Sequence, residues 1–394
     1  MTKRGGATTM LVVGILGAAF LLRAPLTSVP PALSSIRADL GLSPVMAGAT
    51  TAVPLLCLGV FAFLTPLLIA RWGLERTMFA AVVPITLGLL LRGTAGVAVF
   101  FVGAVLIGVG IAIGNVLVPA LIRARFPLRM ALLMGAYVAI LQGSASLGSL
   151  LTAPLDIDAG LGWRVALGVW TVPAALVVLW WIVLVTRRGV PEEDIDPPTG
   201  MASVVRKRLT WAITVFMGFQ SLMFYSLVTW MPAQFVAAGH SPSMAGMLLA
   251  VFSLLGLPGA FVAPHFAAGR YAGWFIIGVY AIQGVGILLL GGGLIGSAIA
   301  AVLCGLAQGT AFSAALTFVA GQPNAGDVPA VSAFAQGTGY ILAAFGPPVL
   351  GGVYSATGGW ETPNLILLAV TVLVAALGAD TGRRLYRAHT ALGR

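Results

Sequence analysis

The sequence predicts an all-α membrane protein with twelve transmembrane helices in two pseudo-symmetric six-helix bundles. Composition, charge placement and an internal repeat lead to this prediction. Of the 394 residues, 59% are hydrophobic and only 8% are charged, and the mean hydropathy is +1.03. A soluble globule of this size needs far more charged side chains to cover its surface, so the solvent around this chain must be lipid.

Twelve apolar stretches are long enough to cross a bilayer, which takes about 20 helical residues. The first is too long for a signal peptide and has no small-residue cleavage site after it, so we expect it to remain as a helix. Cys57 and Cys304 fall inside stretches and are expected as core residues, not a disulfide. The stretches are 9–32, 44–69, 77–94, 97–121, 130–153, 162–186, 209–235, 243–267, 271–291, 293–319, 328–354 and 361–381.

The net charge of +10 reflects membrane topology rather than nucleic-acid binding. With the N-terminus placed in the cytoplasm, 17 of the 21 Lys and Arg residues fall on the cytoplasmic side. Only Arg37, Arg92 and Arg164 fall outside, and Arg23 lies within a stretch. This positive-inside bias predicts a multi-pass protein of the inner (plasma) membrane with both termini cytoplasmic.

One charged segment divides the chain. Residues 187–208 carry nine charged residues and three prolines, a composition typical of a linker. We therefore expect an N-terminal six-helix bundle over 1–186, a cytoplasmic linker over 187–208 and a C-terminal six-helix bundle over 209–394.

The two halves repeat each other. Ser-Pro-Val-Met-Ala-Gly at 43–48 returns as Ser-Pro-Ser-Met-Ala-Gly at 241–246, and Gln-Gly-Ser at 142–144 returns as Gln-Gly-Thr at 336–338. Such matches in chain order at nearly constant spacing indicate a duplication. Six helices return the chain to the same side, so the halves are parallel repeats. A solute site is expected near the midplane between them, with rocking of the halves for alternating access.

The loop between the second and third stretches resembles a degenerate copy of the signature that the major facilitator superfamily carries there, Gly-x-x-x-Asp-Arg-x-Gly-Arg-Arg. Ala70 stands where the superfamily has its acidic residue, so a charge latch built on that Asp is not expected. Arg71, Glu75 and Arg76 are expected to form a cytoplasmic gate loop. The loop reads Ala70-Arg71-Trp72-Gly73-Leu74-Glu75-Arg76.

Three further segments resemble the cyanate and nitroimidazole transporter branch of that superfamily. The resemblance covers essentially the whole chain and implies the major facilitator fold and transport of a small solute. The segments are Leu22-Arg23-Ala24-Pro25-Leu26-Thr27-Ser28-Val29, then Gln220-Ser221-Leu222-Met223-Phe224-Tyr225 followed by Trp230-Met231-Pro232, and Gln336-Gly337-Thr338-Gly339-Tyr340 followed by Gly346-Pro347.

Arg23 is the most informative single residue, because it is the only Lys, Arg, Asp or Glu well away from the ends of an apolar stretch. A cation at a helix centre costs about 2.5–3.5 kcal/mol on insertion scales, so it calls for a partner or a function. Snorkelling to the outer interface is the alternative, since Arg23 lies toward that end. No intramembrane carboxylate is available to pair with it. We therefore expect its partner to be a solute carboxylate, a cyanate-like anion or a nitro group.

Polar side chains near Arg23 and in the repeat-related stretch are the next candidates. Thr27 lies one turn from Arg23, although its hydroxyl can bond back to its own helix. Gln220 is the repeat equivalent of Arg23. Tyr225, five residues later, diverges from Gln220 by about 140°, so both can face one cavity only if it is broad or the helix is broken. Trp230 is a candidate near the outer interface, where Trp is common anyway.

Large polar side chains on helices that line the cavity in the resembled fold complete the candidate set. For each, the alternative is an interhelical hydrogen bond worth about 0.6 kcal/mol. Gln283 is left out because its helix is peripheral in the resembled fold. The additional candidates are Asn115, Gln142, Gln308, Gln336 and Tyr340.

Other function classes lack their residues. Neither Lys3 nor Lys207 follows a glycine, so an ATP-binding loop is not expected. The apolar stretches hold no Asp, Glu or His set for acid–base or metal catalysis, so we expect no enzyme, no metal and no cofactor. We expect a secondary active transporter that moves a small anionic or nitro-bearing organic solute as a monomer in the bilayer, without nucleic acid. A non-transporting sensor on the same scaffold and an exporter of neutral small aromatic compounds remain as alternatives.

Overall fold

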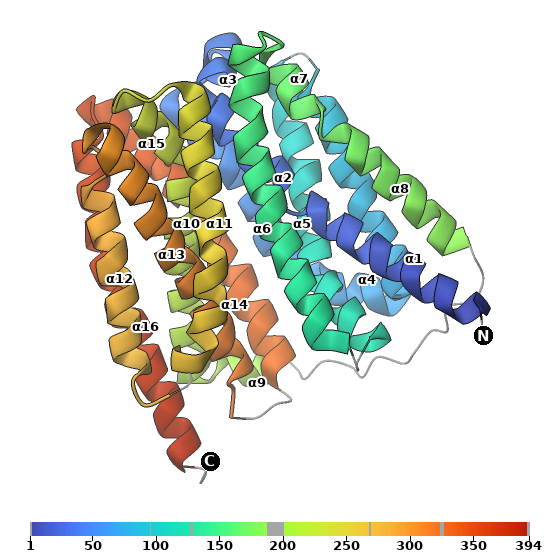
Figure 1. The fold of residues 1–394 in the computed structure, drawn as a ribbon. Helices are drawn as coiled ribbons and strands as arrows, with labels where there is room; N and C mark the ends of the chain where they lie inside the picture. Colours follow the sequence, from blue (N-terminus) through green and yellow to red (C-terminus); the bar gives the residue numbers. More distant parts are fainter. Residues whose placement is uncertain are drawn as a thin grey trace.

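The computed structural model describes residues 2–94, 96–126, 129–186, 201–267, 269–323 and 327–391. Within those ranges the regular elements are all helical, and the long helices run side by side (Figure 1). Most of the expected linker, residues 187–200, lies outside the described residues. Its last part forms the short helix α9 (Met201–Val205) at the lower end of the molecule.

The helices before the linker cover the first six expected stretches. They are α1 (Thr2–Leu21), α2 (Ala24–Thr27), η1 (Pro30–Ala32), α3 (Leu33–Leu40), α4 (Pro44–Arg92), α5 (Val97–Arg125), α6 (Met130–Ala153), the π-helical turn η3 (Pro154–Asp158), α7 (Gly162–Gly168) and α8 (Thr171–Thr186). Those after it are α10 (Arg208–Ala237), α11 (Pro242–Ala267), α12 (Ala272–Leu288), α13 (Gly293–Ala320), α14 (Val328–Ala343), α15 (Gly346–Thr357) and α16 (Glu361–Ala391).

Helix α4 contains two membrane spans joined at Gly73. This residue has φ 74° and ψ 173°, a conformation that glycine adopts without the steric cost of a β-carbon. The Thr77 hydroxyl donates to the carbonyls of Gly73 (2.7 Å) and Leu68 (3.2 Å), which closes the turn. The expected loop at 70–76 is thus only a sharp reversal between two helices.

Ten segments of the described chain are long and apolar enough to cross a membrane, and helix α12 is a shorter apolar one. The remaining expected stretch, 328–354, is divided into α14 and α15 by a break before Gly346-Pro347-Pro348. Proline lacks the N–H that a continuous helix needs and disfavours helical geometry in the residue before it. All twelve expected stretches are therefore largely helical, and three of them, 9–32, 162–186 and 328–354, are divided by a break.

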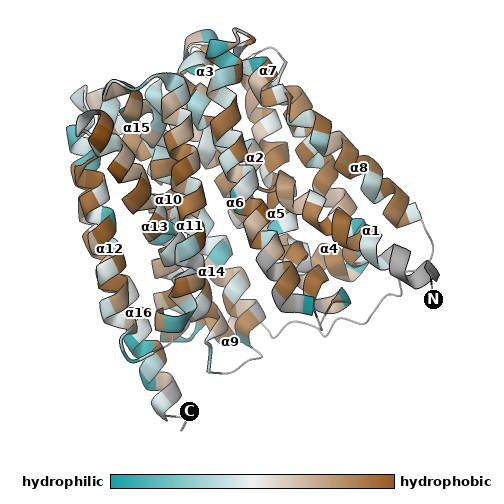
Figure 2. Ribbon diagram, in the orientation of Figure 1, coloured by the Kyte–Doolittle hydropathy of each residue, from teal (hydrophilic) through white to brown (hydrophobic). Residues whose placement is uncertain are grey.

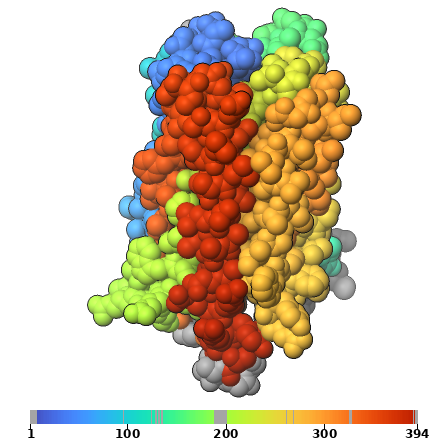
Figure 3. Space-filling view, turned by 90° about the vertical axis from the view of Figure 1, so that its left-hand side faces the viewer, coloured from blue at the N-terminus to red at the C-terminus, as the bar shows by residue number. Residues whose placement is uncertain are grey.

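The outer faces of the bundle are apolar. Leu176 of α8 is 63% exposed, Leu288 of α12 68% and Val372 of α16 71%. Figure 2 shows hydrophobic colouring along α8 and α12 and more hydrophilic colouring around α3 and the end of α16. An apolar surface of this extent requires lipid as the solvent. Helix α16, which carries the exposed Val372, runs the full height of one face of the molecule (Figure 3).

The two sets of helices meet through glycines, α4 packing on α14 and α15, and α6 on α11. A β-carbon on Gly48 would lie 2.6 Å from the backbone of Pro347, and one on Gly246 would lie 2.7 Å from the carbonyl oxygen of Ser149. The Ser243 hydroxyl donates to the Asp158 carboxylate nearby. The beginnings of α4 and α11, near which Gly48, Gly246 and Ser243 lie, are at the end of the bundle opposite the two chain termini (Figure 1).

The closest crossing inside the second set joins α11 to α13. A β-carbon on Gly309 would overlap the backbone of Gly256, which has no flexible side chain to move aside. We expect Gly309→Ala to lower the midpoint of thermal unfolding, because overpacking typically costs about 1–3 kcal/mol. Gly278→Ala is the matched control, since nothing lies within 4 Å of its added carbon. Equal midpoints for the two variants would contradict the close crossing.

Candidate solute-binding site

A cavity of about 300 Å³ lies between the two sets of helices. Before the linker it is bounded by the α1–α2 junction, α5 and α6, and after it by α10, α11, α13 and α14. Pro119 near the end of α5, Leu316 near the end of α13 and Ser332 near the start of α14 line it as well. These three residues lie toward the end of the bundle that carries both termini, so the cavity extends from the middle of the helices in that direction.

The structure brings eight of the ten expected solute-binding residues to this one cavity. They come from five helices and the α1–α2 junction, and are Arg23, Asn115, Gln142, Gln220, Tyr225, Gln308, Gln336 and Tyr340. Gln220 and Tyr225 both line it although they diverge on α10, because the cavity spans several helices. Polar residues predicted as candidates in both halves of the sequence therefore meet at one cavity.

Thr27 and Trp230 do not reach the cavity. The Thr27 hydroxyl donates to the carbonyl of Ala145 at 2.9 Å and so ties α2 to α6. The Trp230 indole N–H donates to the carbonyl of Pro347 at 2.9 Å, and its ring packs on Trp360. Both polar groups are used in contacts between helices, and both side chains are buried.

Arg23 lies where the first transmembrane segment breaks. Helix α1 ends at Leu21, α2 begins at Ala24, and Arg23 between them has φ −129° and ψ −45°. Pro25, the second residue of α2, has no N–H to continue the ladder from α1. Arg23 lies at this break between the two helices, and its side chain lines the cavity.

Aromatic groups surround the Arg23 guanidinium. Its central carbon lies 5.5 Å from the centre of the Phe224 ring, a cation–π geometry worth roughly 0.5–2 kcal/mol. The hydroxyl of Tyr225 lies beside it, and those of Tyr137 and Tyr340 are near enough to interact electrostatically. The Arg23 side chain is partly exposed, and that exposed part faces the cavity. Among the described residues that line the cavity there is no other charged side chain.

Tyr137 and Phe224 were not predicted as site residues. Tyr137 donates its hydroxyl to the Asn115 Oδ1 atom at 3.4 Å, which orients that amide. Phe224 stacks edge-on against Tyr225, whose ring in turn meets Tyr340 at 6.2 Å. The signal that could have found Phe224 is its position four residues after Gln220, on the same face of α10. No comparable signal marks Tyr137 in the sequence.

A chain of amides runs from the cavity into the second set of helices. Gln220 Nε2 donates to Gln308 Oε1 at 3.4 Å, and Gln308 Nε2 donates to Gln283 Oε1 at 2.7 Å. Ser221 donates to Gln220 Oε1 at 3.2 Å. Gln283 is fully buried behind Gln308, so it does not line the cavity, but it fixes which way the Gln308 amide points. Leaving it out on the ground of a peripheral helix missed this supporting contact.

Two further amides connect elements around the cavity. Gln142 Nε2 donates to the carbonyl of Ser253 at 2.9 Å, across the α6–α11 contact. Gln336 Nε2 donates to Ser332 Oγ at 2.9 Å on the same helix. Both side chains also line the cavity, so each amide joins the cavity lining to a neighbouring group of the protein.

Arg92 is a second buried cation. It was expected on the outer side, yet its side chain is completely buried. Its Nη1 donates to the carbonyl of Pro25 at 2.7 Å, and its guanidinium lies over the Phe100 ring at 5.6 Å. Pro25 follows Arg23 by two residues, so Arg92 holds the helix break that presents Arg23. Because Arg92 lies near the end of the apolar stretch 77–94, the sequence suggested a charged residue at the membrane surface and not a buried one.

The expected gate loop contains one ion pair. Glu75 pairs with Arg125 of α5 at 2.7 Å, while Arg71 and Arg76 are exposed. This pair lies within the first set of helices and joins the reversal in α4 to the end of α5.

Comparison with known proteins agrees with this architecture. The sequence profile of the Major Facilitator Superfamily matches residues 15–347. The uncharacterized transporter YycB of Bacillus subtilis is 35% identical over 95% of this chain and 94% of its own length. The 2-nitroimidazole transporter of Escherichia coli is 31% identical over 95% of each chain, and the cyanate transport protein CynX of the same organism is 29% identical over 89% of this chain and 91% of its own.

Solved structures share the fold at low sequence identity. The nucleoside transporter NupG aligns with a TM-score of 0.77 at 13% identity, covering 94% of this chain and 99% of its own. A bacterial homolog of the human lysosomal transporter Spinster aligns with a TM-score of 0.71 at 17% identity, covering 99% and 98%. By profile, sequence and fold, the chain belongs to the major facilitator superfamily of membrane transporters.

Proposed function

We propose that this protein is a secondary transporter that moves a small anionic or nitro-bearing organic solute across the inner membrane, with Arg23 as the solute-binding cation. The observation that carries this proposal is a guanidinium that faces an internal cavity whose described lining contains no carboxylate. A cation in such a place lacks a charge partner until a solute supplies one.

The chemistry of the cavity suits a planar group with two acceptor oxygens. A guanidinium presents parallel N–H donors that match a carboxylate or nitro group in a bidentate arrangement. The hydroxyl of Tyr225 and the amide of Gln220 add hydrogen-bonding groups to the cavity lining. The rings of Phe252 and Phe312 provide apolar surface for the rest of a small solute. A volume of about 300 Å³ is at the small end of ligand pockets, which favours a compact solute.

The names of two relatives support this solute class. One is a 2-nitroimidazole transporter and another a cyanate transport protein. Both names describe small, planar or linear solutes rich in acceptor atoms, the type of solute that a single guanidinium can recognise.

We infer that transport proceeds by alternating access between two bundles, residues 1–186 and 209–394. Contacts of Gly48, Gly246 and Ser243 close the bundles together at the end opposite the termini. The distribution of Lys and Arg supports a cytoplasmic position for both termini, so the cavity extends toward the cytoplasm. The reversal at Arg71, Glu75 and Arg76 lies at that side and is proposed as the gate loop.

The residues that line the cavity also limit how solute transport can be coupled to an ion gradient. A proton relay normally uses an intramembrane carboxylate, and the described cavity residues include none. Uniport, solute exchange and movement of a proton on the solute itself are the mechanisms compatible with these residues.

Arg23→Lys separates charge from geometry. We expect it to lower solute affinity or uptake at least tenfold, about 1.4 kcal/mol, because an ammonium keeps the charge but loses the planar fork. The measurement is a thermal-shift screen of small carboxylates, cyanate and nitroheterocycles on purified protein, followed by uptake of the best binder into proteoliposomes.

Arg37→Lys is the matched control, because Arg37 is not among the residues that line the cavity and its side chain donates to the carbonyl of Leu42. Uptake by this variant should equal that of the wild type. Near-normal uptake by Arg23→Lys would remove Arg23 from the proposed site. Binding without accumulation in vesicles would favour the sensor alternative.

Ser332→Cys tests the direction in which the cavity opens. Ser332 lines the cavity and is partly exposed, so a membrane-impermeant thiol reagent added on the cytoplasmic side should label the introduced cysteine. Ser144→Cys is the control, since Ser144 is buried and donates to the carbonyl of Leu141. The native Cys57 and Cys304 are buried and should react slowly. Faster labelling of Ser332→Cys from the outside would contradict the proposed orientation or state.

A further inference from the structure

A second hollow lies far from the solute cavity, at the end of the molecule that carries the C-terminus. It is a surface groove of about 480 Å³ between the end of α9, the start of α10 and α16. Figure 3 shows the yellow-green segment around residue 200 beside the lower part of α16. Its lining residues are Arg206, Arg208, Trp211, Ala212, Val215, Leu377, Asp380, Thr381 and Arg384.

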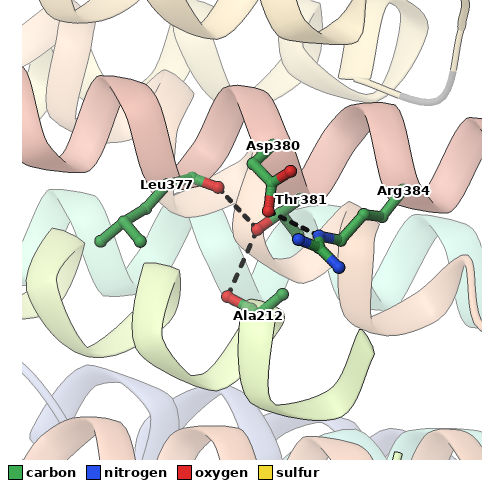
Figure 4. Close-up of polar contacts among 5 residues, drawn as sticks. All are labelled: Ala212, Leu377, Asp380, Thr381 and Arg384. Atoms are coloured by element: carbon green, nitrogen blue, oxygen red, sulfur yellow. Dashed lines mark hydrogen bonds and ion pairs between the residues drawn. The ribbon is translucent and has the colours of Figure 1, made fainter. Parts of the chain in front are cut away.

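One polar contact between α10 and α16, and two within α16, lie among the residues that line the groove (Figure 4). The Thr381 hydroxyl donates to the carbonyl of Leu377 at 2.7 Å and to that of Ala212 at 3.3 Å. Arg384 Nε donates to the Asp380 carboxylate at 2.5 Å. The Thr381–Ala212 contact joins the two helices, so the groove is part of the helix packing rather than a gap beside a loop.

The groove carries an excess of positive charge. It holds three arginines and one acidic residue, Asp380, which is already paired with Arg384. Arg206 and Arg208 are exposed, and within the described residues neither side chain forms a hydrogen bond or an ion pair. Lys207, between them, pairs with Asp327 instead. Two unpaired guanidinium groups therefore flank one groove.

The walls of the groove indicate where it lies relative to the bilayer. Ala212, Val215 and Leu377 are partly exposed and give it an apolar side. Trp211 is 46% exposed, and its indole N–H donates to the carbonyl of Val205 at 2.8 Å. A half-exposed Trp with a satisfied polar edge is typical of the membrane–water interface. The charged rim is thus at headgroup level and the apolar wall at acyl-chain level.

We propose that this groove binds one anionic phospholipid. The phosphate of the lipid is held by Arg206 and Arg208, and an acyl chain lies along Ala212, Val215 and Leu377. Basic pockets between transmembrane helices at the cytoplasmic surface suit anionic headgroups, because each guanidinium adds a charge-assisted hydrogen bond to phosphate oxygen. A free phosphate ion could bind the arginines but would leave the apolar wall uncovered. A phospholipid covers both the arginines and the apolar wall, so it fits the whole groove.

The bound lipid joins the beginning of α10 to the end of α16. Helix α10 continues from Arg208 to Gln220 and Tyr225 of the solute cavity. Lipid binding at this end therefore stabilises the set of helices that follows the linker. This proposal does not depend on the identity of the solute or on transport.

The test compares thermal unfolding of the full-length protein in neutral detergent with added dioleoylphosphatidylglycerol, dioleoylphosphatidylcholine or inorganic phosphate. We expect the anionic lipid alone to raise the midpoint, by about 5 °C at saturation. The double variant Arg206→Gln/Arg208→Gln should lose this shift. The control variant Arg270→Gln/Arg387→Gln removes two other exposed arginines and the same net charge, and it should keep the shift.

Three results would overturn the proposal. They are an equal shift with the zwitterionic lipid, a shift reproduced by inorganic phosphate, and a shift retained by the Arg206→Gln/Arg208→Gln variant. If that variant does not fold, brominated lipids provide a second measurement on the wild type. Brominated phosphatidylglycerol should quench tryptophan fluorescence more than brominated phosphatidylcholine, and Trp211→Phe should abolish the difference. Equal quenching by the two lipids would exclude a headgroup-selective site at Trp211.

Discussion

The structure is organised around one constraint, a cation within the membrane for which the described cavity lining supplies no anion. The Arg23 guanidinium faces the ring of Phe224 and the hydroxyls of tyrosines, and these groups lower its cost without removing its charge. Aromatic faces and phenols carry no formal charge, so the charge of Arg23 is left for a solute to neutralise. A charged side chain is costly in contact with lipid. The helix break, the cavity and its polar lining together keep the Arg23 guanidinium in this cavity and away from lipid.

The helix break is the structural device that meets this need. Irregular backbone is tolerated in a membrane only where other groups satisfy it or where it lines a cavity. Here the carbonyl of Pro25 is satisfied by the buried Arg92 from the end of α4. One cation thus supports the backbone that presents the other. The second broken segment, between α14 and α15, lies after Tyr340 of the same cavity and packs against α4, so both irregular segments adjoin the contact between the halves.

Hydropathy was sufficient to predict the twelve helical stretches, because a bilayer imposes length and apolarity on every span. The repeat between the halves, the scarcity of polar side chains and the resemblance to the superfamily fold together were sufficient to predict eight of the polar residues that line the cavity. Thr27 and Trp230 were predicted as site residues but do not line the cavity. Their polar groups donate to carbonyls 118 and 117 residues away, and no local sequence pattern indicates such partners. Arg92 and Gln283 were missed for the same reason, since each acts through a distant neighbour.

The most direct test of the central claim is to locate a bound anion. Anomalous X-ray diffraction at the bromine absorption edge, from crystals grown with a bromine-labelled small carboxylate or nitroheterocycle, places the ligand without reference to any mutation. The account predicts a bromine peak inside the cavity, with the carboxylate or nitro group about 3 Å from the Arg23 guanidinium. A ligand bound elsewhere, with Arg23 still over Phe224 and an empty cavity, would contradict it.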